Sequence, residues 1–172
     1  MIVDAHIHFD SIQHYERLKS DMDRSGVEQF CALVIERFDD SADGFKQAEA
    51  IWLKLREPSR AFVFGGLDYT GLFGDPLGEP DVPLVEQVQT LRAIGLDGLK
   101  MISGKPNVRQ AVGCPLDDLA FEPMLRWLEE TQFPVLWHVG DPPEFWDKDQ
   151  GTHLGAREGL VVRRKRAAKA AN

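Results

Sequence analysis

The segment IVDAHIH, residues 2–8, is a short apolar run that ends in two histidines, and the organisation of the chain follows outward from it. Its apolar part spans Ile2–Ile7, and four further runs rich in Val, Ile, Leu or Phe lie at 29–36, 61–67, 96–103 and 133–139. Runs of this length and composition are typical of buried β-strands. The sequence therefore predicts five strands.

The segments between these runs carry apolar residues at helical spacing. Tyr15, Leu18 and Met22 mark the first helix, and the same period recurs around Trp52, Val88 and Leu125. Strands that alternate with helices form parallel sheets through right-handed crossovers. We therefore expect an α/β fold, either an open doubly wound sheet or a barrel, since periodicity alone does not separate the two.

Local signals suggest where the helices begin and end. Ser41 and Asp43 are candidate N-caps of the second helix, and Pro58 predicts its end. Gly26 and Gly95 follow the last periodic residues of the first and third helices, as expected for C-terminal caps.

Charge divides the chain into two unequal parts. Residues 1–147 carry 13 basic and 26 acidic side chains, whereas residues 148–172 carry 7 and 2. An acidic body argues against nucleic-acid binding, and the basic tail is predicted to be irregular or helical. Without a signal peptide or a long apolar stretch, a cytoplasmic protein with no membrane partner is expected. Cys31 and Cys114 are predicted to be free thiols.

Three histidines form a candidate metal site. His6 and His8 alternate along one strand, so both imidazoles point to the same face, and neutral imidazole binds Zn, Fe or Mn. His138 ends the fifth run at the same sheet edge and is the candidate third ligand. The alternative is that these histidines pack or hydrogen-bond within the fold. His14 and His153 are interpreted as surface residues.

Two further residues are candidate catalytic groups. Lys100 lies inside the fourth predicted strand, where a buried ammonium needs a partner, a substrate anion, or carbamylation that makes it a bridging metal ligand. Asp141 begins a Pro-stiffened loop that is expected to wall a pocket, although an Asx-type turn explains it equally well. Glu36, at the end of the second run, is a weaker candidate because carboxylates there often cap the next helix.

The motifs VDAHIH (3–8), GLDGLKM (95–101) and PVLWHVGDPPEFW (134–146) resemble those of the amidohydrolase-related family of metal-dependent TIM-barrel hydrolases. The resemblance covers residues 1–147. It implies a divalent metal, usually zinc, held by His6, His8 and His138, and a metal-activated water that attacks an amide, ester or lactone of a small-molecule substrate. A non-oxidative decarboxylase branch with the same histidines is the alternative activity.

The same resemblance implies a partial (β/α)8 barrel over residues 1–147, incomplete at its C-terminus. A full barrel typically needs about 250 residues, and the family's sixth-strand histidine and eighth-strand aspartate have no counterpart here. A truncated barrel is therefore expected. Its unpaired strand edges predict a second alternative, a non-catalytic fragment that forms homo-oligomers through those edges.

Overall fold

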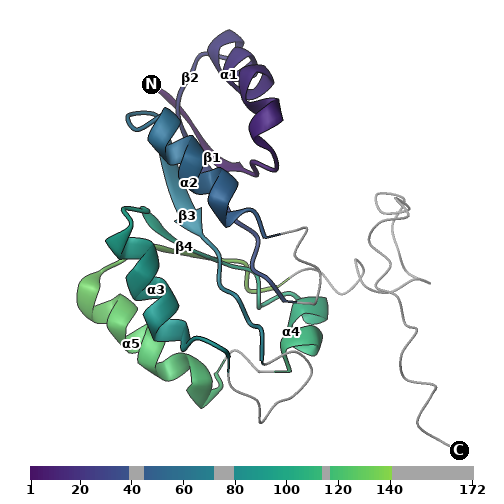
Figure 1. Ribbon diagram of the computed structural model, residues 1–172, viewed down its shortest axis with the longest axis vertical. Helices are drawn as coiled ribbons and strands as arrows, with labels where there is room; N and C mark the ends of the chain where they lie inside the picture. The colour runs from purple at the N-terminus through teal and green to yellow at the C-terminus, as the bar shows by residue number, and fades with distance from the viewer. Residues whose placement is uncertain (39–44, 72–79, 114–116, 141–172) are drawn as a thin grey trace, which may run out of the picture. The chain divides into compact units, whose positions relative to one another are not determined.

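The computed structural model describes residues 1–38, 45–71, 80–113 and 117–140 (Figure 1). Its strands are β1 (Ile2–Ile7), β2 (Val27–Leu33), β3 (Ala61–Gly65), β4 (Gly98–Met101) and β5 (Val135–Trp137). They form one sheet in the order β1-β2-β3-β4-β5, and every neighbouring pair is parallel. The prediction of an α/β fold with five parallel strands is confirmed.

Helices connect the strands and flank the sheet, which curls into a half-barrel (Figure 1). The α-helices are α1 (Tyr15–Arg24), α2 (Gln47–Arg56), α3 (Leu84–Ala93), α4 (Pro106–Val112) and α5 (Glu122–Thr131), and two 3₁₀ turns, η1 (Ile12–His14) and η3 (Leu119–Phe121), precede α1 and α5. The sequence did not predict α4. That helix has only seven residues, too few for a helical period to stand out.

The predicted helix ends agree with the structure at the glycines. Gly26 and Gly95 adopt left-handed φ angles of 68° and 87° just after α1 and α3. Glycine takes this conformation without the steric cost that a Cβ imposes. The predicted end of α2 also holds, since that helix stops at Arg56, two residues before Pro58.

The predicted start of α2 is wrong. The helix begins at Gln47 with Lys46 in the N-cap position, and no side chain caps it. The proposed caps, Ser41 and Asp43, lie outside the described residues.

The core fills the space between the sheet and the helices. Its fully buried side chains include Val63 and Leu99 from the sheet and Leu53 and Val88 from α2 and α3. The first compact unit of the chain spans Met1–Val139, and the second unit begins at Gly140. The predicted boundary at residue 147 lies outside the described residues. None of the helices in the described part of the chain has the length and apolarity needed to span a membrane.

Candidate metal centre

His6 in β1 and His8, which directly follows that strand, point their rings toward one another. The Nε2 atoms of His6 and His8 are 3.2 Å apart, and the ring planes cross at 77°. Two nitrogens bound to one tetrahedral zinc at about 2.0–2.1 Å would lie roughly 3.3 Å apart. The separation of the two Nε2 atoms therefore fits two ligands of a single ion.

A hydrogen bond orients the His8 ring. Its Nδ1 lies 2.8 Å from the carbonyl oxygen of Leu33, the last residue of β2. A carbonyl oxygen only accepts hydrogen bonds, so Nδ1 carries the proton and the lone pair lies on Nε2. Metal-binding histidines are commonly fixed in this way by a backbone carbonyl on the second ring nitrogen. His8 thus turns the lone pair of Nε2 toward His6 Nε2, where it can accept a hydrogen bond from that ring or bind a metal ion.

The pKa of the His6 imidazole is lowered, which favours the neutral form that metal ions bind. Partial burial lowers the pKa of its imidazole, and the positive charges of Lys100, His8 and His138 lower it further. Asp4, whose carboxylate accepts a 3.1 Å hydrogen bond from the His6 amide, acts in the opposite direction. Groups from β4 and the end of β5 therefore lie within electrostatic range of the β1 histidines.

His138 directly follows β5, as the sequence predicted. Its amide donates a 2.8 Å hydrogen bond to the carbonyl of Met101, which extends the pairing of β4 with β5. Gly104 packs against this segment so closely that a Cβ atom there would lie 2.2 Å from the His138 carbonyl oxygen. Within the described ranges, no group of three His, Cys, Asp or Glu side chains is arranged to hold one ion. His138 as the third ligand stays a prediction.

Lys100 is buried, as predicted, with 1% of its surface exposed. Burial lowers the pKa of its ammonium group, and the charge of Glu36 opposes that shift. Glu36 is itself 2% exposed, and it does not cap α2, which has no side-chain cap. The helix cap considered for Glu36 is therefore not formed, and its side chain lies in the interior.

The Glu36 carboxylate is held by donors from two neighbouring strand ends. The hydroxyl of Tyr69 donates a 2.7 Å hydrogen bond, and the amide of Ile102 donates one of 2.5 Å. Burial raises the pKa of Glu36 to about 7, while these bonds, a bond from the Ser103 amide, and the charge of Lys100 limit the rise. Tyr69 was missed in the sequence; the signal available was its position two residues after an apolar run.

The remaining predicted residues fall into two groups. His14 is exposed in η1, as predicted, and Cys31 is a free thiol whose pKa is raised by burial. Asp141, His153 and Cys114 lie outside the described residues, so their predicted roles stay predictions.

Comparisons of the chain with protein-family models, with curated proteins and with solved structures found no match. The resemblance to the amidohydrolase-related family therefore rests on the three sequence motifs alone. The structure adds the positions of His6, His8, Lys100 and His138, which are the described candidate residues of those motifs.

Proposed function

We propose that this chain is part of a metal-dependent hydrolase of the amidohydrolase-related TIM-barrel type. His6, His8 and His138 would hold the metal, with zinc favoured by the imidazole donors. The proposal is carried by the 3.2 Å separation of the two Nε2 atoms together with the bond from His8 Nδ1 to the Leu33 carbonyl. The two Nε2 atoms are at hydrogen-bonding distance, and an ion bound between them would replace the proton that they share.

The residues of this chain would hold the metal ion and bind the substrate. A bound divalent ion supplies a water of near-neutral pKa and polarises the substrate oxygen. His6 and His8 would fix the ion at the C-terminal end of β1, the edge at which parallel barrels carry their sites. Lys100 would face an anionic part of a small-molecule substrate, whereas Asp141, the other candidate catalytic group, lies outside the described residues.

Metal content tests the proposal. The purified protein is expected to bind about one zinc, iron or manganese per chain at saturation, and His6→Ala and His8→Ala are each expected to lose it. His14→Ala is the matched control, because His14 is an exposed histidine of η1 and should leave the bound metal unchanged. Equal metal content in all three variants would overturn the assignment.

A non-oxidative decarboxylase with the same histidines is the second activity to test. The buried ammonium of Lys100 favours substrates with a carboxylate or another anionic group. Release of CO2 from a panel of aromatic and unsaturated carboxylic acids would identify this activity, whereas production of a new carboxylate from an ester, amide or lactone would identify hydrolysis.

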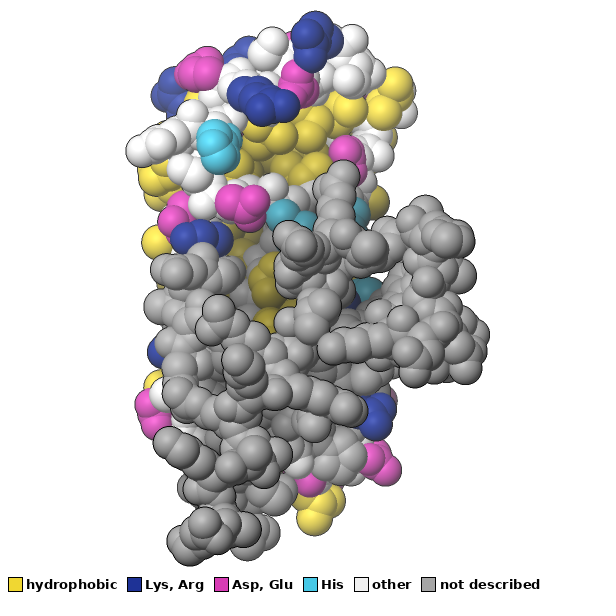
Figure 2. Space-filling model, turned by 90° about the vertical axis from the view of Figure 1, so that its right-hand side faces the viewer, with side chains coloured by type: hydrophobic (Ala, Val, Ile, Leu, Met, Phe, Trp, Pro, Cys, Tyr) yellow, Lys and Arg dark blue, Asp and Glu magenta, His cyan; other side chains and the backbone are white. Residues whose placement is uncertain are grey.

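Assembly through the sheet edges is a candidate from a different class. The outer strands β1 and β5 are each paired on one side only within the described sheet, and Ile2, Val3, Val135 and Val139 are exposed there. Figure 2 shows hydrophobic side chains at the surface among charged ones in the upper part of the molecule. Unpaired edges favour association. Size-exclusion chromatography tests this candidate, and a folded monomer at high concentration would contradict it.

A further inference from the structure

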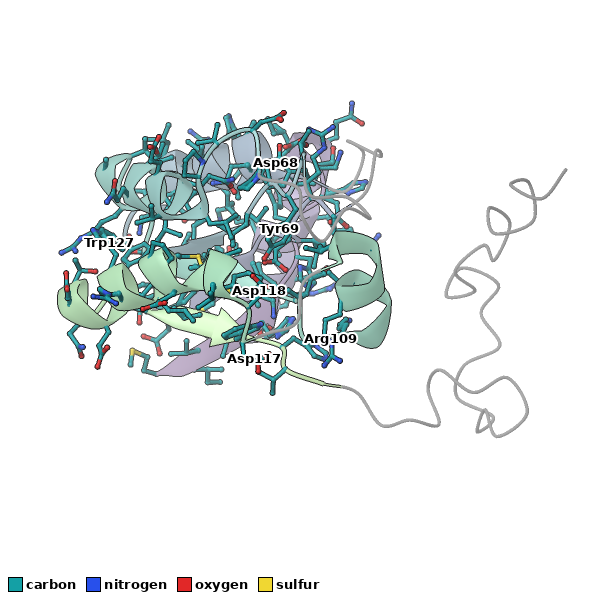
Figure 3. All side chains as sticks on the ribbon, turned by 90° about the horizontal axis from the view of Figure 1, so that it is seen from below. Asp68, Tyr69, Arg109, Asp117, Asp118 and Trp127 are labelled. Atoms are coloured by element: carbon teal, nitrogen blue, oxygen red, sulfur yellow. The ribbon has the colours of Figure 1, made fainter. Side chains whose placement is uncertain are left out.

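Three polar side chains from successive strand ends are buried together. Glu36 follows β2, Tyr69 follows β3 and Lys100 lies in β4, and their exposed fractions are 2%, 0% and 1%. Figure 3 shows Tyr69 in the interior, surrounded by the sheet and helices. Burying charged and polar groups costs free energy unless they are paired. The partners of each group therefore indicate what the cluster does.

The partners of Glu36 suit an ionised carboxylate. The Tyr69 hydroxyl donates to Oε1 at 2.7 Å, the Ile102 amide donates to Oε2 at 2.5 Å, and the Ser103 amide also donates to the carboxyl group. An ionised carboxylate accepts without donating, so it can satisfy all three groups at once. Burial favours the neutral acid, and the three donors together with the charge of Lys100 limit the rise of the Glu36 pKa to about 7, so the carboxylate is mostly ionised at pH 8.

Lys100 is the positive charge that faces this carboxylate. The charges that act on its ammonium are those of Glu36, which is attractive, and of Lys105 at the start of α4, which is repulsive. Lys100 in turn acts on His6. Lys100 forms no salt bridge among the described residues. The Glu36 carboxylate is bonded to the amide of Ile102, which follows Lys100 by two residues at the end of β4, and its negative charge acts on the ammonium from that position.

We propose that Glu36 is a positioning residue for Lys100. Its carboxylate, fixed by Tyr69 and by the β4 backbone, keeps the buried Lys100 ammonium charged at the edge of the half-barrel that carries the histidines. The charged lysine is then available to an anionic group of a substrate, and this last step rests on the proposed function. The pairing of Glu36 with Lys100 does not depend on a metal.

Lysine labelling tests the pairing directly, because only the neutral amine reacts with acetic anhydride. The metal-free protein is treated with trace acetic anhydride at pH 8, and acetylation of Lys100 is measured by peptide mass spectrometry relative to Lys54. In Glu36→Gln, we expect Lys100 to react about tenfold faster, which corresponds to a fall of one unit in its pKa. Glu28→Gln, which removes an exposed carboxylate of β2, is the matched control and should leave the ratio unchanged.

A second variant keeps the test decisive if Glu36→Gln does not fold, a failure that circular dichroism would reveal. Tyr69→Phe removes one donor to the carboxylate, so Glu36 should be ionised to a smaller extent near pH 7.5. Labelling of Lys100 should then rise about threefold at that pH and return to the wild-type value at pH 9. A Lys100 rate that stays at the wild-type value in the folded variants would overturn the proposal. Loss of metal in His6→Ala alongside that result would leave the proposed function standing.

Discussion

His6 in the edge strand β1 and His8 just after it are exposed, whereas Glu36 after β2 and Lys100 in β4 are buried. The Nε2 atoms of the two histidines are 3.2 Å apart, and the only other ring hydrogen bond that the described residues show for this pair joins His8 Nδ1 to the Leu33 carbonyl. The Glu36 carboxylate instead has three donors and contributes to the interior itself. The histidines can therefore be changed at little cost to folding, while the buried cluster cannot.

The largest effect on stability is expected when the buried carboxylate is removed. Glu36→Ala would leave the Tyr69 hydroxyl and two backbone amides without an acceptor and Lys100 without its counter-charge. We expect a loss of about 3–5 kcal/mol in the free energy of unfolding, measured by urea denaturation. A loss below about 1 kcal/mol, the ordinary effect of a point mutation, would show that the cluster is not held as described.

The glycine beside His138 offers the next test. Gly104→Ala would place a Cβ atom 2.2 Å from the His138 carbonyl oxygen and 2.3 Å from the Val139 Cα. Because backbone atoms must move, we expect a loss of about 2–3 kcal/mol and weaker metal binding. Gly140→Ala is the matched control, since nothing lies within 4 Å of a Cβ there. Equal stability of the two variants would contradict the close packing of β4 and β5.

The pH dependence of stability provides a test without disrupting the fold. The pKa of Glu36 is about 7 in the folded protein and 4.5 as its ordinary value, so the folded state binds a proton that the unfolded state has released. The stabilisation that Glu36 contributes by binding this proton is fully present below pH 4.5, and it is lost as the pH rises from there through 7. The loss amounts to about 3 kcal/mol. In Glu36→Gln, this part of the pH dependence should disappear; an identical profile in the variant would rule out Glu36 as its source.

The smallest effect is expected at the histidines. His8→Ala removes one hydrogen bond to the Leu33 carbonyl and should cost about 1 kcal/mol of stability. His6→Ala, which removes an exposed ring, should cost less than about 0.5 kcal/mol. Thermal unfolding of the metal-free variants measures both. A large loss in either would mean that the histidine pair supports the fold rather than serving as a ligand site.

The histidine pair could be predicted from the sequence, whereas the buried cluster around Glu36 could not. The period-two spacing of His6 and His8 was sufficient to place both rings on one face, because that property is local to one strand. The five strands and the helix ends at Gly26 and Gly95 were predictable for the same reason. Their signals lie within a few residues of the elements that they define.

The Glu36 cluster could not be predicted because its members are far apart in the sequence. Glu36 and Ile102 are 66 residues apart, and their hydrogen bond depends on the register of three strands. A carboxylate at a strand end has several possible partners, and the helix cap that seemed the ordinary choice is not formed. The short helix α4 was missed for a related reason, since its buried Val108 and Val112 face a core that only the tertiary fold creates.

The central claim is that the Nε2 atoms of His6 and His8 bind one ion while Nδ1 of His8 keeps its proton. Long-range ¹H–¹⁵N NMR spectra of the histidine rings, recorded during zinc titration, test it most directly. We expect both Nε2 resonances to shift together at one equivalent of zinc, with His8 Nδ1 remaining protonated and the His14 ring unchanged. Shifts of equal size at all three rings, or none at His6 and His8, would contradict the account.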